Sequence, residues 1–353
     1  MTSAAAMSKA FTSSLRNRSI DASRQPFRWA IAGYGDVVQR RVAPAILAGE
    51  NVVLAGIWGR TLARASETAV RFGTVATDAI APLCDSIDAL YVATPVSSHM
   101  ELATLAAGAG CHVLIEKPLS AGLGQVSPLA QLARSKSLCI GVAYYRRLLP
   151  AVRWLGEEIR SGRFGRSRSA LVQFSMPYTP SPNDPMVWRY DRMIAGGGVL
   201  ADAGSHRLDI LSILFGPPVS LIARFLDVTA GGCERAAQVS LAWQDGLVAQ
   251  LDVAWRAHHQ DRLEIEFESA GLVLDPLDGG TAQISWRDGR TDWLELPGSP
   301  NLHEPLVRDF ELAVRNQHAP ACDLSGGILV DRMLAAAAIS NSTGSAVRLD
   351  MNA

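Results

Sequence analysis

The stretch that decides the fold is Trp29-Ala-Ile-Ala-Gly33-Tyr34-Gly35-Asp36-Val37-Val38, where a short apolar run ends in a glycine-rich turn. The first glycine permits a tight turn, and the second lets the backbone approach a pyrophosphate, whose charge a following helix N-terminus would stabilise. The motif alone is weak, because Val38 stands where a third glycine could be. Its place between an apolar run and a helical segment favours a dinucleotide site over a glycine-lined turn without a ligand.

From Phe27 to about Val142, short apolar runs alternate with helical stretches. Such alternation is typical of a doubly wound parallel sheet with helices on both faces, the Rossmann type of α/β fold. We expect strands at 29–32, 52–57, 89–93, 113–115 and 138–142, and helices at 37–47, 62–72, 99–109 and 125–134.

After Tyr144 the pattern changes to helices followed by strand-like runs. Asp245-Gly246 and Asp288-Gly289 each separate two such runs, and Asp-Gly is a strong hairpin signal. We therefore expect an α+β domain with an antiparallel sheet, helices near 151–161 and 199–214, and a closing helix near 330–340. The predicted organisation is a mobile tail at 1–26, a dinucleotide-binding domain at 27–147, and a substrate and oligomerisation domain at 148–353.

The composition excludes several classes of protein. With 353 residues, 48% hydrophobic and 19% charged, the chain can bury two cores. A formal net charge of -1 gives no basic field for nucleic acid or an anionic membrane surface. No apolar run reaches the ~18 residues of a membrane span, and the N-terminal residues lack a secretory pattern. The five cysteines are isolated, so we expect no disulfide framework, no metal site and a soluble, cytoplasmic protein.

The residues about 20 positions after the glycines determine which dinucleotide is preferred, because an acidic residue there would bind the ribose 2′-hydroxyl of NAD. The chain reads Ile57-Trp-Gly59-Arg60 there, without a carboxylate. Arg60 could contact a 2′-phosphate or stack on the adenine, so NADP is favoured and NAD remains possible. The alternative is that Arg60 only faces solvent at the start of a helix.

Two further stretches lie at the carboxyl ends of expected parallel strands, where doubly wound sheets bind their ligands. They are Thr94-Pro95 with His99, and Glu116-Lys117-Pro118. Lys117 is one of only three lysines in the chain and follows three apolar residues, so we expect it at the mouth of the sheet. Isolated lysines after strands are more often solvated than catalytic.

These segments resemble the Gfo/Idh/MocA oxidoreductases, which include glucose–fructose oxidoreductase and inositol dehydrogenase. The resemblance continues through Trp188-Arg189, the segment from Gly196 to Asp209, and Asn301-Leu-His303. It implies a Rossmann domain with a second, open-faced domain, homodimers or homotetramers, and NAD(P)-dependent redox chemistry on a sugar, cyclitol or polyol. It also implies that Lys117, Asp202 and His206 are catalytic.

Asp202, His206 and Asp209 are spaced i, i+4 and i+7, so a regular helix would place them on one face. Asp202 could then orient His206, which would act as general acid/base, while Lys117 polarises the substrate oxygen and relays its proton. The roles of Lys117 and His206 could be exchanged. The alternative is a buried histidine that a neighbouring aspartate satisfies. We expect the cofactor to contact Gly33, Tyr34, Gly35, Asp36, Val37, Val38, Gly59, Arg60, Thr94, Pro95, His99, Glu116, Lys117, Trp188 and Arg189.

Three functions remain open. The first is hydride transfer between a nicotinamide and a sugar-like substrate. The second is cleavage of a glycosidic bond through transient oxidation with a recycled cofactor. The third is a non-catalytic dinucleotide-binding regulator, against which an intact Lys117, Asp202 and His206 set argues. Tyr145-Arg146-Arg147 and His258-His259 are weaker candidates for the site, and His112 and His318 are not expected in it.

Overall fold

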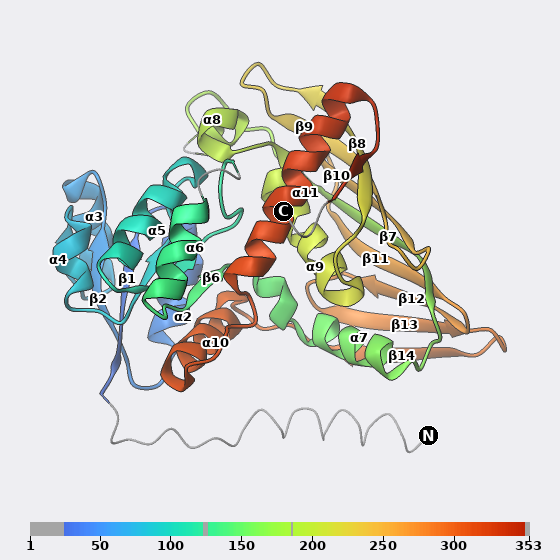
Figure 1. Cartoon of the computed structure of the whole chain (residues 1–353), viewed down its shortest axis with the longest axis horizontal. Helices are drawn as coiled ribbons and strands as arrows, with labels where there is room; N and C mark the ends of the chain where they lie inside the picture. Colours follow the sequence, from blue (N-terminus) through green and yellow to red (C-terminus); the bar gives the residue numbers. More distant parts are fainter. Residues whose placement is uncertain (1–24, 123–125, 185, 350–353) are drawn as a thin grey trace.

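The computed structural model describes residues 25–122, 126–184 and 186–349 (Figure 1). The predicted tail therefore lies outside the described residues, apart from its last two positions. Two sheets face each other across a layer of helices (Figure 1). No helix in the described ranges is long and apolar enough to cross a bilayer.

The first sheet is the predicted parallel one, with its six strands in the order β3-β2-β1-β4-β5-β6. The strand order reverses between β1 and β4, which makes their carboxyl ends the topological switch point where such sheets bind ligands. The sheet is buried on both faces, as the apolar runs predict. The strands are β1 (Phe27–Ala32), β2 (Val52–Trp58), β3 (Ala76–Thr77), β4 (Ala89–Val92), β5 (His112–Ile115) and β6 (Ile140–Val142).

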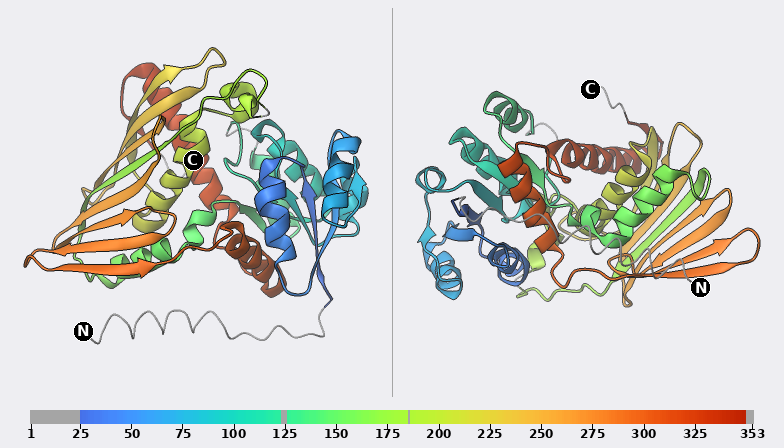
Figure 2. Two further views of the ribbon diagram at one scale, coloured as in Figure 1. Left: turned by 180° about the vertical axis from the view of Figure 1, so that it is seen from behind. Right: turned by 90° about the horizontal axis from the view of Figure 1, so that it is seen from below.

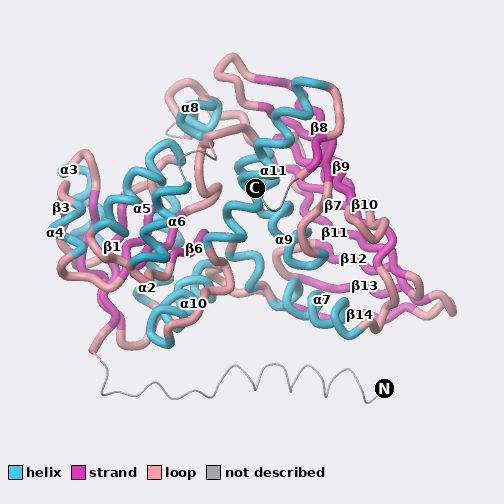
Figure 3. The backbone as a smooth tube through the Cα atoms, in the orientation of Figure 1, coloured by secondary structure: helices cyan, strands magenta, loops and turns pink. Residues whose placement is uncertain are grey.

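Helices cover both faces of this sheet (Figure 3). The first helix after the glycines contains one wide π-helical turn, η1 (Val38–Val42), and continues as α2 (Ala43–Leu47). Small buried residues such as Ala103 and Ala107 let α5 pack closely on the sheet. The others are α3 (Leu62–Arg71), α4 (Ile80–Cys84), η2 (Val96–Ser98), α5 (His99–Gly108) and α6 (Val126–Ser135).

The second sheet has nine strands in the order β14-β13-β12-β11-β7-β10-β9-β8-β15. All neighbours are antiparallel except β7 and β10. The two Asp-Gly hairpins lie where the sequence predicts them, with φ of 92° at Gly246 and 87° at Gly289. The strands are β7 (Ser167–Met176), β8 (Ser220–Val228), β9 (Glu234–Ala242), β10 (Val248–Trp255), β11 (Gln260–Phe267), β12 (Ala270–Asp275), β13 (Gly280–Trp286), β14 (Thr291–Leu296) and β15 (Val347–Arg348).

One face of this sheet carries helices and the other is open (Figure 2). The remaining helical elements are η4 (Tyr145–Leu148), α7 (Pro150–Ser161), η5 (Val187–Tyr190), α8 (Arg192–Ala195), η6 (Leu200–Gly204), α9 (Ser205–Phe215), α10 (His303–Asn316) and α11 (Leu324–Thr343).

The last two helices return to the parallel sheet. Phe310 of α10 packs its ring 5.5 Å from that of Trp29 in β1, and Val142 of β6 donates a backbone hydrogen bond of 2.8 Å to Cys322. Helix α11 begins six residues before the expected start, because Asp323 caps it by accepting from the Gly326 N–H. The C-terminal segment therefore belongs structurally to both halves.

Candidate active site

The glycine-rich turn at the switch point is shaped for a pyrophosphate. Gly33 has a φ of 126°, and a side chain there would overlap the Ala93 carbonyl. A Cβ at Gly35 would meet no atom within 4 Å, so the backbone is open to a ligand. A helix begins at Asp36, directly after this opening. Free N–H groups and open space are the features that a dinucleotide phosphate requires.

The end of β2 is where the sequence predicts the adenosine half of the cofactor. The ring of Tyr34 lies where a Cβ on Gly59 would be, 2.6 Å from its atoms, so glycine is required at that position. Arg60 follows as an exposed side chain, and no carboxylate stands between residues 57 and 60. The guanidinium is therefore accessible to a phosphate or an aromatic ring.

His99 holds together the two loops that follow β4 and β5. Its Nε2 lies 2.9 Å from the Thr94 carbonyl oxygen and its Nδ1 lies 3.1 Å from that of Pro118. The ring is 1% exposed, and burial lowers its pKa despite these contacts. Both ring nitrogens are thus engaged by the backbone, and His99 fixes the peptide that follows Lys117.

Lys117 reaches from the parallel-sheet half to the other half of the molecule. Its Nζ donates to the carbonyl oxygen of Asp202 at 2.6 Å and to its carboxylate Oδ1 at 3.0 Å. The second carboxylate oxygen of Asp202 lies 3.2 Å from Nη1 of Arg189. Burial would raise the pKa of Asp202, but the two cations outweigh it and lower that pKa to about 2. Asp202 is therefore an anion held between two cations.

His206 lies on α9 and is 3% exposed. Burial, followed by the charges of Arg146, Lys117, Arg207 and His303, lowers its pKa well below 6.5. Its Nδ1 is buried without a hydrogen-bond partner. The imidazole is therefore neutral near pH 7 and retains hydrogen-bonding capacity for a ligand.

The structure differs from the expectation that Asp202 orients His206. The carboxylate of Asp202 is taken by Lys117 and Arg189, and Asp209 forms an ion pair of 2.6 Å with Arg147. The wide turn of η6, which contains Asp202, interrupts the regular helical spacing. An assumed i, i+4, i+7 face therefore does not describe this segment.

The glycine run before Asp202 allows a close contact between two backbone segments. A side chain at Gly198 would overlap the backbone of Glu234 in β9. The buried Glu234 carboxylate accepts from the N–H groups of Gly198 at 3.0 Å and Leu200 at 3.0 Å. The glycine thus lets a strand and the start of the helical segment meet, and the carboxylate satisfies that helical end.

Glu116, Tyr91 and His303 form a buried cluster beside Lys117, in which the sequence predicted a role for Glu116 but not for Tyr91 or His303. One carboxylate oxygen of Glu116 accepts from the Tyr91 hydroxyl at 2.8 Å and lies 3.3 Å from Nε2 of His303. The other accepts from the backbone N–H of Lys117 at 3.2 Å. The only signal was the Asn301-Leu-His303 segment, which lies far away in sequence.

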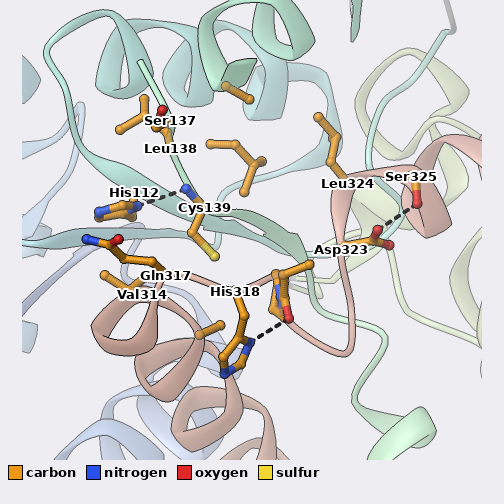
Figure 4. Close-up of a pocket in the computed structure, with 15 residues that line it drawn as sticks. His112, Ser137, Leu138, Cys139, Val314, Gln317, His318, Asp323, Leu324 and Ser325 are labelled. Carbon is orange, nitrogen blue, oxygen red and sulfur yellow. Dashed lines mark hydrogen bonds between the residues drawn. The ribbon is translucent and has the colours of Figure 1, made fainter. Parts of the chain in front are cut away.

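A separate pocket of about 690 Å³ lies at the amino-terminal edge of the parallel sheet, between β5, β6 and α10 (Figure 4). His112 and His318 line it, as does Cys139, whose N–H donates to Nδ1 of His112 at 2.9 Å. Neither Lys117, Asp202 nor His206 lines this pocket. The two histidines are therefore remote from the site at the switch point.

A glycine-lined switch point beside a lysine, carboxylate and histidine set is the arrangement of a dinucleotide-dependent oxidoreductase. The chain belongs to the GFO/IDH/MocA oxidoreductases, which confirms the resemblance seen in the sequence. Residues 27–144 match the model of the oxidoreductase family with an NAD-binding Rossmann fold, and residues 152–273 match the GFO/IDH/MocA C-terminal domain.

Curated relatives span nearly the whole chain. A dTDP-3,4-didehydro-2,6-dideoxy-alpha-D-glucose 3-reductase of Streptomyces antibioticus is 31% identical over 88% of this chain and 97% of the relative. A 1,5-anhydro-D-fructose reductase of Ensifer adhaerens is 28% identical over 85% of this chain and 92% of its own length. A solved levoglucosan dehydrogenase with NADH and levoglucosan shares the fold, with a TM-score of 0.84 at 21% identity over 93% of this chain and all of the other.

Proposed function

We propose that this oxidoreductase transfers a hydride between a nicotinamide dinucleotide and a hydroxyl or keto carbon of a sugar, cyclitol or related polyol. The observation that carries the proposal is the bond from Lys117, at the end of β5, to Asp202, four residues before His206. It joins a catalytic candidate of each half at the carboxyl-terminal edge of the parallel sheet, the edge that also carries the glycine turn. The curated relatives named above are sugar reductases, which supports this substrate class.

The cofactor fits the residues present. The open backbone at Gly35 would hold the pyrophosphate, and Arg60 would contact the adenosine end. When bound, the nicotinamide supplies or accepts the hydride. Arg60 and the missing carboxylate favour NADP over NAD. Titration of the protein with each reduced cofactor tests this preference, and clearly tighter binding of NADH than NADPH would refute it.

Lys117 and His206 divide the proton chemistry of the substrate oxygen. The neutral imidazole of His206 is suited to accept the proton of a substrate hydroxyl during oxidation. The Lys117 ammonium is suited to donate a hydrogen bond to that oxygen as its charge develops. Asp202 and Arg189 hold the ammonium in place. In the reducing direction the same two groups return the proton.

Absorbance of the reduced nicotinamide, followed with a panel of sugars, cyclitols and their keto forms, tests the proposal. We expect turnover with at least one member and with net oxidation or reduction. Cofactor retained through purification, with bond cleavage but no net redox change, would favour the glycoside-cleaving alternative. Cofactor binding with no turnover across the panel would favour a regulator.

We also propose that the chain forms homodimers or homotetramers through the open face of the nine-stranded sheet (Figure 2). That face exposes apolar side chains, among them Ile222 and Leu226 of β8. Sedimentation or light scattering of the purified protein tests this, and a monomer at micromolar concentration would refute it.

A further inference from the structure

His303 lies at the start of α10 and has no role in the chemistry described so far. Its ring is 4% exposed, and its Nε2 lies 3.3 Å from the Glu116 carboxylate. Glu116 in turn accepts from the backbone N–H of Lys117. One edge of the imidazole is therefore linked to the residue that precedes the catalytic lysine.

The same ring is linked to the other catalytic group by tilted ring contacts through Tyr145. The centroids of the His303 and Tyr145 rings are 4.8 Å apart, and those of Tyr145 and His206 are 4.7 Å apart. Tyr144 packs edge-on against His206 at 5.6 Å. The array Glu116–His303–Tyr145–His206 thus connects β5, α10, η4 and α9 in one continuous set of contacts.

Hydrogen bonds and an ion pair also hold the array in place. Arg146 donates to the Tyr145 hydroxyl at 2.9 Å and forms a two-point ion pair with Asp278 at 2.6 Å. Burial would raise the pKa of Glu116, but His303, Lys117 and Tyr91 outweigh it and lower that pKa. The carboxylate is therefore an anion whose buried charge depends on its hydrogen-bond donors.

We infer that His303 is a positioning residue that sets both catalytic groups at once, Lys117 through Glu116 and His206 through Tyr145. This inference rests on the proposed function, because it assigns His303 to the same site. A histidine serves here because it combines a donor edge for a carboxylate with a flat face for stacking. Phenylalanine keeps only the stacking face, and glutamine keeps only the donor.

The test uses His303→Phe, His303→Gln and the control His318→Gln, which changes an exposed histidine shortly after the C-terminal end of α10. Misplacement of a reacting group by about 1 Å can cost 10²-fold in rate, so we expect each His303 variant to lower kcat about 10- to 100-fold. KM and cofactor affinity should change by less than about threefold, because neither substrate nor cofactor contacts His303 in this assignment. The control should behave as wild type.

A second readout does not need turnover. Burial is the largest cause of the lowered pKa of His206, and Arg146 on η4, Lys117 after β5, Arg207 on α9 and the His303 ring on α10 face it and lower that pKa further. If His303 holds the His206 ring in its buried place through Tyr145, either substitution lets that ring become more hydrated, so the NMR titration midpoint of His206 should rise in both variants. A purely structural histidine would lower the melting temperature without moving that midpoint.

Wild-type kcat in both variants, or an unmoved His206 midpoint, would overturn the inference. A loss confined to one variant would also overturn it, since both links would not be needed. If the His303 variants do not fold, Tyr145→Leu, compared with Tyr145→Phe, breaks the stack alone and must raise the midpoint. If wild type transfers no hydride, the proposed function fails while the NMR titration still decides this inference.

Discussion

The two halves of the molecule build their parts of the site in different ways. The parallel-sheet half uses strand ends and loops, and the features it offers to the proposed cofactor are an open backbone at Gly35 and an exposed arginine, Arg60. The other half uses a buried network in which Asp202 and His206 are surrounded by cations. Under the proposed function, the first half would thus receive the cofactor at exposed groups, while the second half keeps Asp202 as an anion and His206 as a neutral imidazole.

The largest expected effect comes from Lys117, the side chain of the first half that bonds to Asp202 in the second. Lys117→Ala removes the hydrogen-bond donor to the substrate oxygen, so kcat should fall by about 10²–10⁴-fold while cofactor binding persists. Lys136→Ala, which removes an exposed lysine of the same domain, is the matched control. Stopped-flow turnover and cofactor fluorescence measure the two quantities. Unchanged turnover in Lys117→Ala would show that the first half contributes no side chain to the reaction through Lys117.

The pH dependence of His206 sharpens the comparison, because only the second half carries a strongly lowered histidine pKa. For alcohol oxidation, kcat/KM should stay level down to pH 6.5 and fall only below it, as the imidazole becomes protonated. The unfolded histidine takes up its proton first, so His206 also lowers the stability of the fold as the pH falls below 6.5. An acid limb centred above pH 7 that His206→Asn abolishes would contradict this assignment.

The sequence predicts the first half well because its signals are local. A glycine turn after β1 and Lys117 after β5 each follow from a few neighbouring residues. The site residues of the second half were harder to predict, because contacts between segments distant in sequence bring them together. The stack of His303 on Tyr145 and the capping of the η6 region by Glu234 join residues that no period or spacing relates. The wide turn of η6 and the pairing of Asp202 with Lys117 and Arg189 are further features that helical periodicity could not show.

Helix α10 shows the same limit. Its apolar residues pack against the parallel sheet, as Phe310 does on Trp29, although the helix is more than 150 residues past the end of that sheet. Strand β14 precedes α10 and is followed by a polar turn, and the sequence analysis predicted no helix at residues 303–316. Helix α11 was expected to start near residue 330, after Gly326-Gly327. Gly327 instead lets α11 approach Val142 in β6.

A smaller effect is expected at the cofactor end of the first half. Charge-assisted hydrogen bonds contribute about 1.5–3 kcal/mol, so Arg60→Ala should weaken NADPH binding about 10- to 100-fold. NADH affinity and kcat at saturating cofactor should change little, because no reacting group lies there. Arg134→Ala, at an exposed arginine of α6, is the control for lost charge. Equal losses for NADH and NADPH would show that Arg60 stacks on the adenine instead of binding a 2′-phosphate.

The smallest effect is on stability, at the seam between the halves. Asp331 of α11 is 4% exposed, accepts from the N–H of Ser120 at 2.9 Å and from its hydroxyl at 2.6 Å, and has one oxygen without a partner. Burial raises its pKa from 3.8 to about 7. The folded state thus holds a proton that the unfolded state loses between those values, so this carboxyl lowers stability as the pH rises from 3.8 to about 7.

Asp331→Asn keeps an acceptor for Ser120 and removes this titration. Its melting temperature relative to wild type should therefore rise between pH 5 and pH 8, by about 2–4 °C for each kcal/mol gained. Glu157→Gln, at an exposed carboxylate of α7, should show no such trend. A constant difference between Asp331→Asn and wild type across that range would mean that Asp331 is already ionised at pH 5. The contact between the halves would then contain a buried carboxylate anion, as the second half does at Asp202. Buried charge would in that case not be a property of the second half alone.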